Sequence, residues 1–397
     1  MFIKIRKVNR KPDIPYSYTP LVEEDGGGLY LLFMQLTHLS IVNYKNLEQV
    51  DLSFSPKINC FIGNNGMGKT NLLDAIYYLS FCKSFTNPID VQNVRHDTEF
   101  FLLQGNYLRG TSDEAVYCGL KRKQKKQFKL NKKEYERLSD HIGFLPLVII
   151  SPADGALISE GSDERRKFID SVISQYNRQY LTELIRYNKA LMQRNNLLKN
   201  NGKQDELVFD IWEEQMAQSG NFIYETRKAF VEEFVPIFQA RFQYITSGNE
   251  TVTLQYQSQL AARDFQESLR LSRERDCILG YTTVGTHKDD LEMLLGEYPI
   301  KRVGSQGQNK SFLVSLKFAQ FDFLKRASNL TPLLLLDDIF DKLDARRVAQ
   351  IILLVSGDAF GQIFITDTNR EHLDHLLNAS GCEVSYFLVD SGEVKAI

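Results

Sequence analysis

Apolar and polar residues alternate along the chain from Met34 onward, and the period of the pattern changes at several points. Alternating positions between Met34 and Phe54 predict two strands joined near residues 44–46. Ile58–Ile62 is a short apolar run, which is typical of a strand buried on both faces, and a helix is predicted for Asn71–Phe81. Residues 99–150 alternate like a small antiparallel set of strands that ends at Leu145–Ile150.

From Asp163 the period lengthens to about 3.6 residues, which is the period of an amphipathic helix. One apolar stripe continues to about Leu198, a polar break follows at residues 200–203, and a second stripe runs from Glu206 to Tyr244. Two helices joined by a tight polar turn predict an antiparallel helical hairpin. At 1.5 Å per residue each helix would reach on the order of 50 Å, so the hairpin would protrude from a globular body.

The C-terminal third alternates between strand-like and helical segments, which is the pattern of an α/β fold. The predicted elements are a strand at Thr251–Gln257, a charged helix near 262–275, a strand at Leu333–Leu336, a helix near 344–356, a strand at Gln362–Thr366, another helix, and a last strand near Ser385–Val389.

Composition narrows the choice of partners. The 48 lysines and arginines nearly balance the 50 aspartates and glutamates, giving a formal net charge of −2. This charge balance excludes binding to nucleic acid or anionic lipid through the net charge alone. A polyanion would have to bind at a local basic patch or at a surface that forms only with a ligand. No apolar stretch is long enough to span a bilayer, no secretory signal is visible, and the five cysteines lie far apart. We therefore expect a reduced, cytoplasmic protein without a membrane partner.

A glycine-rich stretch between the strand at 58–62 and the helix at 71–81 fits the pattern G-x-x-x-x-G-K-[ST]. Glycines let successive backbone N–H groups turn toward phosphates, and the following helix N-terminus adds positive potential. Lys69 would lie between the β- and γ-phosphates of ATP, and the Thr70 hydroxyl would be a ligand of Mg²⁺. The predicted nucleotide-binding residues are Gly63, Asn64, Asn65, Gly66, Met67, Gly68, Lys69 and Thr70.

A P-loop needs an acidic position at the end of a neighbouring strand. Leu333–Leu336 predicts that strand, and Asp337 and Asp338 follow it directly. Asp337 is the natural partner of Mg²⁺, and Asp338 is the natural general base for an attacking water. Together with Lys69, Asp338 is therefore a predicted catalytic residue.

A second phosphate-binding motif is predicted shortly before this strand. Ser305, Gly307 and Gln308 stand at the start of a helical pattern and resemble the signature motif of ABC-type ATPases, which acts in trans on the nucleotide of a second subunit. The simpler alternative is a Gly-Ser loop that caps a helix. Asp341 and Asp344 resemble the D-loop of the same superfamily, and either aspartate could also cap the next helix.

Two departures from the ABC pattern favour slow hydrolysis. Asp338 stands where glutamate is usual, and residues 365–368 contain Thr366 and Thr368 where a switch histidine is usual. A threonine hydroxyl can contact a phosphate, but it cannot shuttle a proton at neutral pH. The sequence therefore predicts a weak ATPase that works as a switch.

Further motifs resemble those of the RecF family. Residues 151–155 and 161–170 are similar to its P-x-D and G-x-x-x-R-R-x-F-x-D stretches, and residues 286–291 are similar to its G-x-H-[RK]-D-D element. The Ser-Gln-Gly-Gln signature and the Asp-Asp pair are also normal for that family, and the resemblance extends from about Met34 to the C-terminus. Asp154 then occupies the place of a metal-sensing loop in SMC-like relatives.

The resemblance implies an α/β fold of the ABC/SMC-type P-loop ATPases, with a split nucleotide-binding lobe and a helical-hairpin arm. Its expected parts are an extension at 1–33, either flexible or an artefact of an upstream start codon, lobe I at 34–160 and 331–397, and lobe II with the arm at 161–330.

The resemblance also implies a function in DNA replication, recombinational repair and the SOS response. Members dimerise on ATP, bind double-stranded DNA next to single-stranded regions, and promote recombinase loading together with recombination mediator proteins. A transport-coupled ABC ATPase subunit is an alternative, although the predicted hairpin replaces a coupling subdomain. A nuclease-linked SMC-like ATPase would need an additional domain, and a small-molecule kinase would not need the signature helix.

DNA binding requires a local cationic surface. Residues 121–133 contain eight basic residues and no acidic one, and they are predicted to form a hairpin that turns near Asn131. Candidate contacts are Lys121, Arg122, Lys123, Lys125 and Lys126. The alternative is an ordinary solvated strand pair. His287, beside Asp289 and Asp290, could form a metal site, but hydrogen bonding between lobes is the more usual use of such a group.

Overall fold

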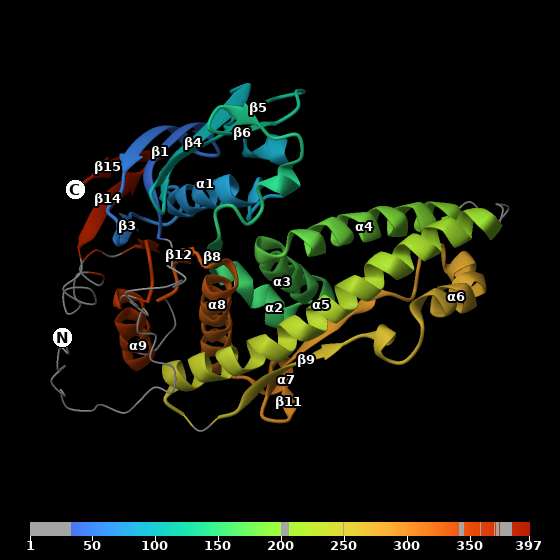
Figure 1. The fold of residues 1–397 in the computed structure, drawn as a ribbon. Helices are drawn as coiled ribbons and strands as arrows, with labels where there is room; N and C mark the ends of the chain where they lie inside the picture. Colours follow the sequence, from blue (N-terminus) through green and yellow to red (C-terminus); the bar gives the residue numbers. More distant parts are fainter. Residues whose placement is uncertain are drawn as a thin grey trace, which may run out of the picture.

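The computed structural model describes residues 33–199, 206–248, 250–340, 345–357, 359–368 and 383–397, together with Arg370 and Leu373. These residues form a two-sheet body from which a helical arm projects (Figure 1). The predicted extension at 1–33 lies outside the described residues, apart from Phe33. The fold begins where the alternating pattern begins, because strand β1 starts at Met34.

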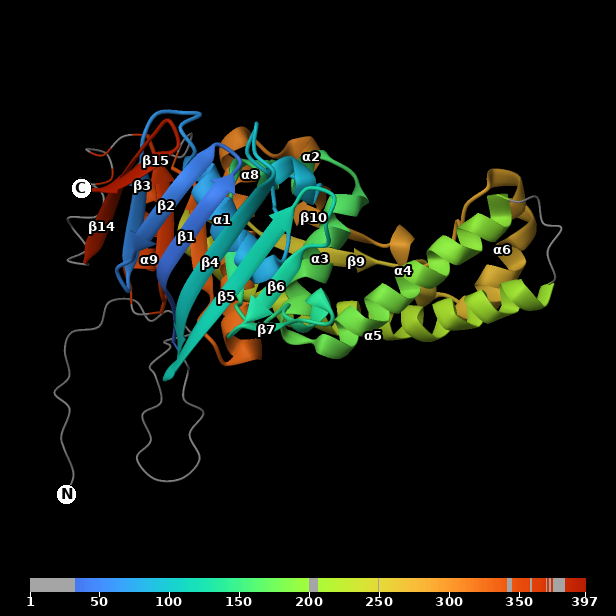
Figure 2. The same cartoon turned by 90° about the horizontal axis from the view of Figure 1, so that it is seen from above.

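The first sheet is antiparallel, and its strands follow the order β2-β1-β4-β5-β6-β7. It forms one curved outer layer of the body (Figure 2). The predicted turn near residues 44–46 joins the first two strands. The strands are β1 (Met34–Tyr44), β2 (Leu47–Ser53), β4 (Phe100–Arg109), β5 (Ser112–Lys121), β6 (Gln127–Leu130) and β7 (Lys133–Glu134).

The second sheet is mostly parallel and has the order β15-β14-β3-β13-β12-β8. It collects strands from both ends of the sequence: β3 (Ile58–Ile62), β8 (Leu147–Ile150), β12 (Leu333–Asp337), β13 (Ile363–Asp367), β14 (Val384–Asp390) and β15 (Glu393–Ala396).

The assignment of residues 145–150 to the antiparallel set was wrong. β8 pairs in parallel with β12, and Leu147 lies opposite Leu333. All four residues of β8 are buried, which is expected of a strand that is covered on both faces.

Helix α1 (Lys69–Phe81) and helix α8 (Gln306–Ser328) cover opposite faces of the second sheet. Because side chains alternate along a strand, Leu333 and Leu335 of β12 join the core that contains α1, whereas Leu334 and Leu336 join the core that contains α8. The carboxyl ends of β3 and β12 are thereby placed at the start of α1.

The predicted hairpin is present, but its first helix is shorter than the apolar stripe suggested. The stripe from 163 to 198 is divided between α3 (Ser162–Tyr176) and α4 (Arg178–Lys199). Asn177 separates them with φ −120° and ψ 96°, and its side-chain oxygen accepts a hydrogen bond from the backbone N of Tyr180 at 2.9 Å. An asparagine that caps a new helix in this way competes with a continuous helix.

The second helix of the arm matches its prediction, because α5 runs from Glu206 to Thr246 with Pro236 inside it. The arm continues into β9 (Val252–Gln257), which forms a three-stranded sheet with β10 and β11. The remaining elements of this part are α2 (Ala156–Ser159), α6 (Phe265–Leu279), β10 (Asp290–Leu295), β11 (Tyr298–Pro299) and α7 (Ile300–Val303). Short 3-10 helices occupy Asp90–Asn93, Leu138–Asp140, Pro152–Gly155, Gln259–Ala261 and Thr286–Lys288.

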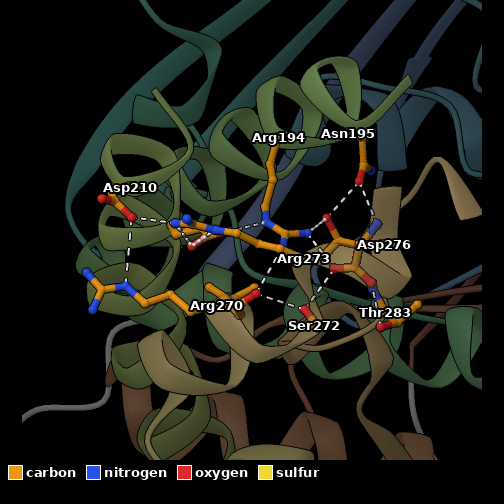
Figure 3. A network of polar contacts seen from close by, with 11 residues as sticks. Arg194, Asn195, Asp210, Arg270, Ser272, Arg273, Asp276 and Thr283 are labelled. Atoms are coloured by element: carbon orange, nitrogen blue, oxygen red, sulfur yellow. Dashed lines mark hydrogen bonds and ion pairs between the residues drawn. The ribbon is translucent and has the colours of Figure 1, made fainter. Parts of the chain in front are cut away.

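A buried charge network holds α6 against α4 and α5 at the far end of the arm (Figure 3). The side chain of Arg194 is 0% exposed. Its guanidinium donates hydrogen bonds to Glu213 on α5 at 3.0 Å, to Asp276 on α6 at 2.6 Å and to the Thr282 hydroxyl at 2.9 Å. Fully buried charges are tolerated only when they are paired in this way, so the network specifies one arrangement of the three helices.

The predicted C-terminal strands and the helix near 344–356 are confirmed by β12, β13, β14 and by α9 (Ala345–Ser356). The helix predicted between the last two of these strands lies outside the described residues. In the part of the chain that the structure describes, every helix is too short or too polar to cross a membrane.

Candidate nucleotide-binding site

The glycine-rich loop joins β3 to α1 as the motif requires. Gly68 caps α1 with φ 116°, and no side chain caps this helix. The first N–H groups of α1 therefore have no capping side chain, which is the arrangement that binds phosphate. A Cβ at Gly63 would lie 2.1 Å from the carbonyl oxygen of Val389, so the loop and β14 meet at a distance that only glycine permits.

Lys69 folds back over the loop. Its Nζ donates hydrogen bonds to the carbonyl oxygens of Gly63 at 2.8 Å and Asn64 at 3.1 Å, and the residue is only 4% exposed. The ammonium group therefore lies within the curve of the loop, where phosphates of a bound nucleotide would compete with these two carbonyls for it.

Thr70 and Asp337 meet across the site. The Thr70 hydroxyl lies 3.0 Å from each carboxylate oxygen of Asp337. Burial raises the pKa of Asp337, hydrogen bonds from Thr366 and Thr70 lower it, and the nearby charge of Asp338 raises it again. A hydroxyl and a carboxylate beside a phosphate-binding loop are oxygen ligands of the kind that Mg²⁺ prefers, so these residues fit the expected metal.

Asp338 adopts a conformation that is uncommon for a residue other than glycine. Its φ is 46°, and its backbone N donates a hydrogen bond to the Thr366 hydroxyl at 3.0 Å. The same hydroxyl donates to Asp337 at 2.8 Å. Thr366 thus links both aspartates, which differs from the phosphate contact considered for it in the sequence. Strained backbone of this kind collects at functional sites.

Asn46 supports the loop, although the sequence alone does not indicate this role. The Asn46 amide donates to the carbonyl oxygen of Met67 at 3.1 Å and accepts from the Asn71 side chain at 2.7 Å. A Cβ at Gly68 would also collide with Asn46 at 2.8 Å. Asn46 therefore fixes the loop from the β1–β2 turn, and no recognised motif contains it.

The predicted signature residues begin α8. Ser305 and Gln308 form a reciprocal cap, in which Gln308 N donates to the Ser305 hydroxyl at 3.2 Å and Ser305 N donates to the Gln308 side chain at 2.8 Å. Gln308 also donates to Glu250 at 2.6 Å. The residues are grouped as the motif predicts, and Ser305 is exposed to solvent. The D-loop residues Asp341 and Asp344 lie outside the described residues.

The basic segment at 121–133 forms the predicted hairpin, and Asn131 and Lys132 turn it with positive φ. Lys121, Lys123 and Lys125 are exposed. Two other candidates differ from the expected solvent-facing cations.

Lys126 donates to Asp90 at 2.7 Å and to the Cys82 carbonyl at 2.6 Å. Arg122 Nε donates to the Thr98 carbonyl at 3.0 Å. Both side chains therefore connect the first sheet to neighbouring segments: Lys126 to the end of α1 and the 3-10 helix at 90–93, and Arg122 to the loop before β4.

The remaining motif residues are tied to neighbouring elements. Asp154 caps its own short helix through Ser151 and pairs with Lys317 of α8 at 2.8 Å. His287 accepts from Tyr187 and reaches the Thr282 carbonyl.

No group of three His, Cys, Asp or Glu side chains suited to a metal occurs among the described residues. Four cysteines, at 60, 82, 118 and 277, are free thiols.

These features define an α/β protein with the fold of ABC/SMC-type P-loop ATPases. The SMC head domain of Pyrococcus furiosus shares this fold with a TM-score of 0.55 at 16% identity, over 92% of this chain and 96% of that one. A family model described as "RecF/RecN/SMC N terminal domain" matches residues 35–385.

Closer relatives identify the particular family. The chain is 62% identical over 364 residues to the DNA replication and repair protein RecF of Bacteroides fragilis, covering 91% of this chain and 98% of the relative. Identity to the RecF protein of Flavobacterium johnsoniae is 50% over 350 residues, covering 87% and 98%. The solved recombination mediator protein RecF-ATP of the RecFOR pathway superimposes with a TM-score of 0.83 at 28% identity, over 93% of this chain and 98% of that one. The chain belongs to the RecF family, as the sequence motifs indicated.

Proposed function

We propose that this chain is an ATP-switched DNA-binding protein of replication and recombinational repair. The observation that carries the proposal is the contact of Thr70 with Asp337 beside the uncapped start of α1. Lys69 and the free N–H groups would hold the phosphates of ATP, and Thr70 and Asp337 would hold Mg²⁺, whose charge would offset that of the phosphates. Asp338 would orient and deprotonate the attacking water.

The proposed switch is ATP-dependent dimerisation. Ser305 stands exposed at the start of α8, a 23-residue helix whose N-terminus carries partial positive charge. Such a surface would close over the γ-phosphate held by a second subunit, which makes ATP a component of the interface. Weak hydrolysis would then set the lifetime of the dimer.

The proposed ligand is duplex DNA next to a single-stranded region, bound in concert with recombination mediator proteins that load a recombinase. A relative that is 62% identical over 364 residues is a DNA replication and repair protein by name, which supports this role over a transport-coupled or nuclease-linked ATPase. Exposed Lys121, Lys123 and Lys125 would contact the DNA backbone.

Binding of labelled gapped, fully duplex and single-stranded DNA by the full chain, with and without ATP and Mg²⁺, tests the proposal. Tight binding that requires ATP and prefers gapped or duplex DNA is expected. Equal binding of all three forms, or binding that ignores ATP, would contradict it.

A further inference from the structure

Two motifs that the nucleotide site does not use meet at one cavity of about 510 Å³. The first lies on α3 and the second on the 3-10 helix at Thr286–Lys288, more than a hundred positions later in the sequence. We call this cavity the motif pocket. Its lining consists of Ser162, Asp163, Arg166, Lys167, Asp170, Leu184, Tyr187, Asn188, Arg227, Thr286, His287 and Lys288.

One cation of the motif pocket is already neutralised. Arg227 is 2% exposed and pairs with Asp170 at 2.8 Å and with Asp289 at 2.9 Å. It also donates to the Thr286 carbonyl at 2.9 Å, so it fastens the two motifs to each other. Because both carboxylates face it, Arg227 is part of the wall and is not available to a ligand.

The histidine of the pocket is also fully engaged. A backbone carbonyl can only accept, so the contact of His287 Nε2 with the Thr282 oxygen at 3.1 Å places the ring proton on Nε2. Nδ1 then accepts from the Tyr187 hydroxyl at 2.8 Å. Burial lowers the pKa of His287 to about 4, so the ring is neutral at pH 7. Neither nitrogen is left for a metal or for proton transfer.

The remaining charges leave the pocket positive. The lining also contains Arg166, Lys167 and Lys288. Asp163, whose side chain is 80% exposed, pairs with Arg166, and Glu164, outside the lining, pairs with Lys167 at 2.5 Å. The pair of Lys167 with Glu164 lies at the surface, and such pairs contribute little. The side chain of Arg166 is only 12% exposed, and its guanidinium also donates to the Ser162 hydroxyl at 2.7 Å and to the Asp289 carbonyl at 2.5 Å.

Several donors converge on the pocket. Burial, and to a smaller extent the charge of Arg227, lowers the pKa of Arg166, whereas the nearby carboxylates of Asp289, Asp290 and Asp170 raise it. The N-terminus of the 15-residue α3 has no side-chain cap and adds positive potential. Lys288 lies exposed over the Tyr281 ring at 5.2 Å, and the Asn188 amide is exposed beside the pocket.

We propose that the motif pocket binds a phosphodiester group of the DNA backbone, with Lys288 as the contact to its oxygens and Arg166 as a buried charge that attracts it. This inference rests on the proposed function. A phosphodiester requires cations and hydrogen-bond donors only. A free nucleotide would also require a surface for its base, whereas Leu184 is the one apolar side chain among the described lining residues, and the Tyr187 ring is buried.

Salt titrations of DNA binding test the pocket. The full chain with ATP and Mg²⁺ is titrated against a labelled gapped duplex at several salt concentrations, as wild type, Lys288→Ala and Lys189→Ala. Lys189 is a matched control, because it is exposed on α4 next to Asn188 but lies outside the lining. Loss of one phosphate contact should reduce the slope of log K against log salt by about 0.9. We expect this change for Lys288→Ala and not for Lys189→Ala.

A second variant tests the motif pocket independently of the Lys288→Ala substitution. Asn188→Asp introduces a negative charge beside the pocket and should weaken DNA binding several-fold at low salt. If Lys288→Ala and Lys189→Ala have the same slope and Asn188→Asp binds normally, the pocket proposal is overturned while the proposed function stands. If the wild-type chain does not bind DNA in an ATP-dependent way, the proposed function fails, and the pocket proposal fails with it.

Discussion

The hydroxyl of Thr70 lies 3.0 Å from both carboxylate oxygens of Asp337, although the two residues are 267 positions apart in the sequence. The contact exists because β3 and β12 lie in one parallel sheet, separated by β13, and end at the same edge. Parallel sheets place ligand sites at the carboxyl ends of their strands. The two halves of the proposed ATP and Mg²⁺ site are therefore joined by the topology of the second sheet.

Substitution of Lys69 by alanine should abolish useful ATP binding. The ammonium group, now bonded to two loop carbonyls, is the cation expected between the phosphates. Charged hydrogen bonds contribute about 1.5–3 kcal/mol each, so affinity should fall by roughly 100-fold or more. Titration calorimetry with ATP and Mg²⁺ measures this. Lys83→Ala, at an exposed position just after α1, is the control and should bind like wild type.

Asp338→Asn should separate binding from hydrolysis. An amide cannot take a proton from water, so the rate of hydrolysis should fall by about 10²- to 10⁴-fold while ATP affinity changes little. Single-turnover hydrolysis and equilibrium binding measure the two quantities. A variant that hydrolyses at the wild-type rate would remove Asp338 from the role of general base.

Ser305→Arg should block the subunit interface without affecting nucleotide binding. The added side chain would project from the exposed start of α8 toward the proposed partner subunit, whereas the P-loop of the same chain is untouched. Analytical ultracentrifugation with ATP should detect monomers only. Gln218→Arg, an equal charge change at an exposed position of α5, should dimerise normally. Dimers of the Ser305 variant would show that the interface lies elsewhere.

Arg194→Ala should destabilise the arm. The substitution leaves Asp276 buried without a cation, which costs about 3–5 kcal/mol of unfolding free energy, whereas Glu213 keeps its pair with Arg273 at 2.6 Å. Arg186→Ala removes an exposed pair with Glu183 on the same helix and should cost less than about 1 kcal/mol. Urea unfolding of both variants gives the comparison, and similar losses would argue against a dominant role for the buried network.

Acid should destabilise the protein partly through His287. Burial lowers its pKa from 6.5 to about 4, so the folded state favours the neutral ring. Its contribution is complete above pH 6.5 and is lost as the pH falls toward 4, with a magnitude on the order of 3 kcal/mol. His287→Gln should therefore lose less stability than wild type between pH 7 and pH 4.5 in urea unfolding. Burial also lowers the pKa of His141 to about 4, and the contribution of His141 to the loss of stability in acid should be similar in both proteins. Identical pH profiles would contradict this account.

Much of the site could be predicted from the sequence because its chemistry is local. A few consecutive residues encode each of the P-loop, the strand before it and the Asp337-Asp338 pair. The 3.6-residue period of apolar residues predicts nearly all of α5. Two elements were assigned incorrectly. β8 has the buried pattern of a strand in either kind of sheet, and only its pairing with β12 decides between them. The break before α4 depends on the cap formed by Asn177.

Long-range polar contacts could not be predicted, because one sequence does not show which side chains meet. The basic segment around Lys126 predicts a solvent-facing cation, but Lys126 donates hydrogen bonds to Asp90 and to the Cys82 carbonyl within the fold. Thr366 stands where a switch histidine is usual, yet its hydroxyl forms hydrogen bonds with both Asp337 and the backbone N of Asp338. Such contacts follow from the arrangement of the sheets and have no local signal.

Light scattering of the wild-type chain with and without ATP and Mg²⁺ tests whether ATP joins two chains into a dimer. We expect the mass of a single chain without nucleotide and twice that mass with ATP, returning to the single-chain mass after hydrolysis. The ATP-bound species should persist longer in Asp338→Asn than in wild type. A mass that is the same in both conditions, at protein concentrations where ATP is bound, would contradict the ATP-gated dimer.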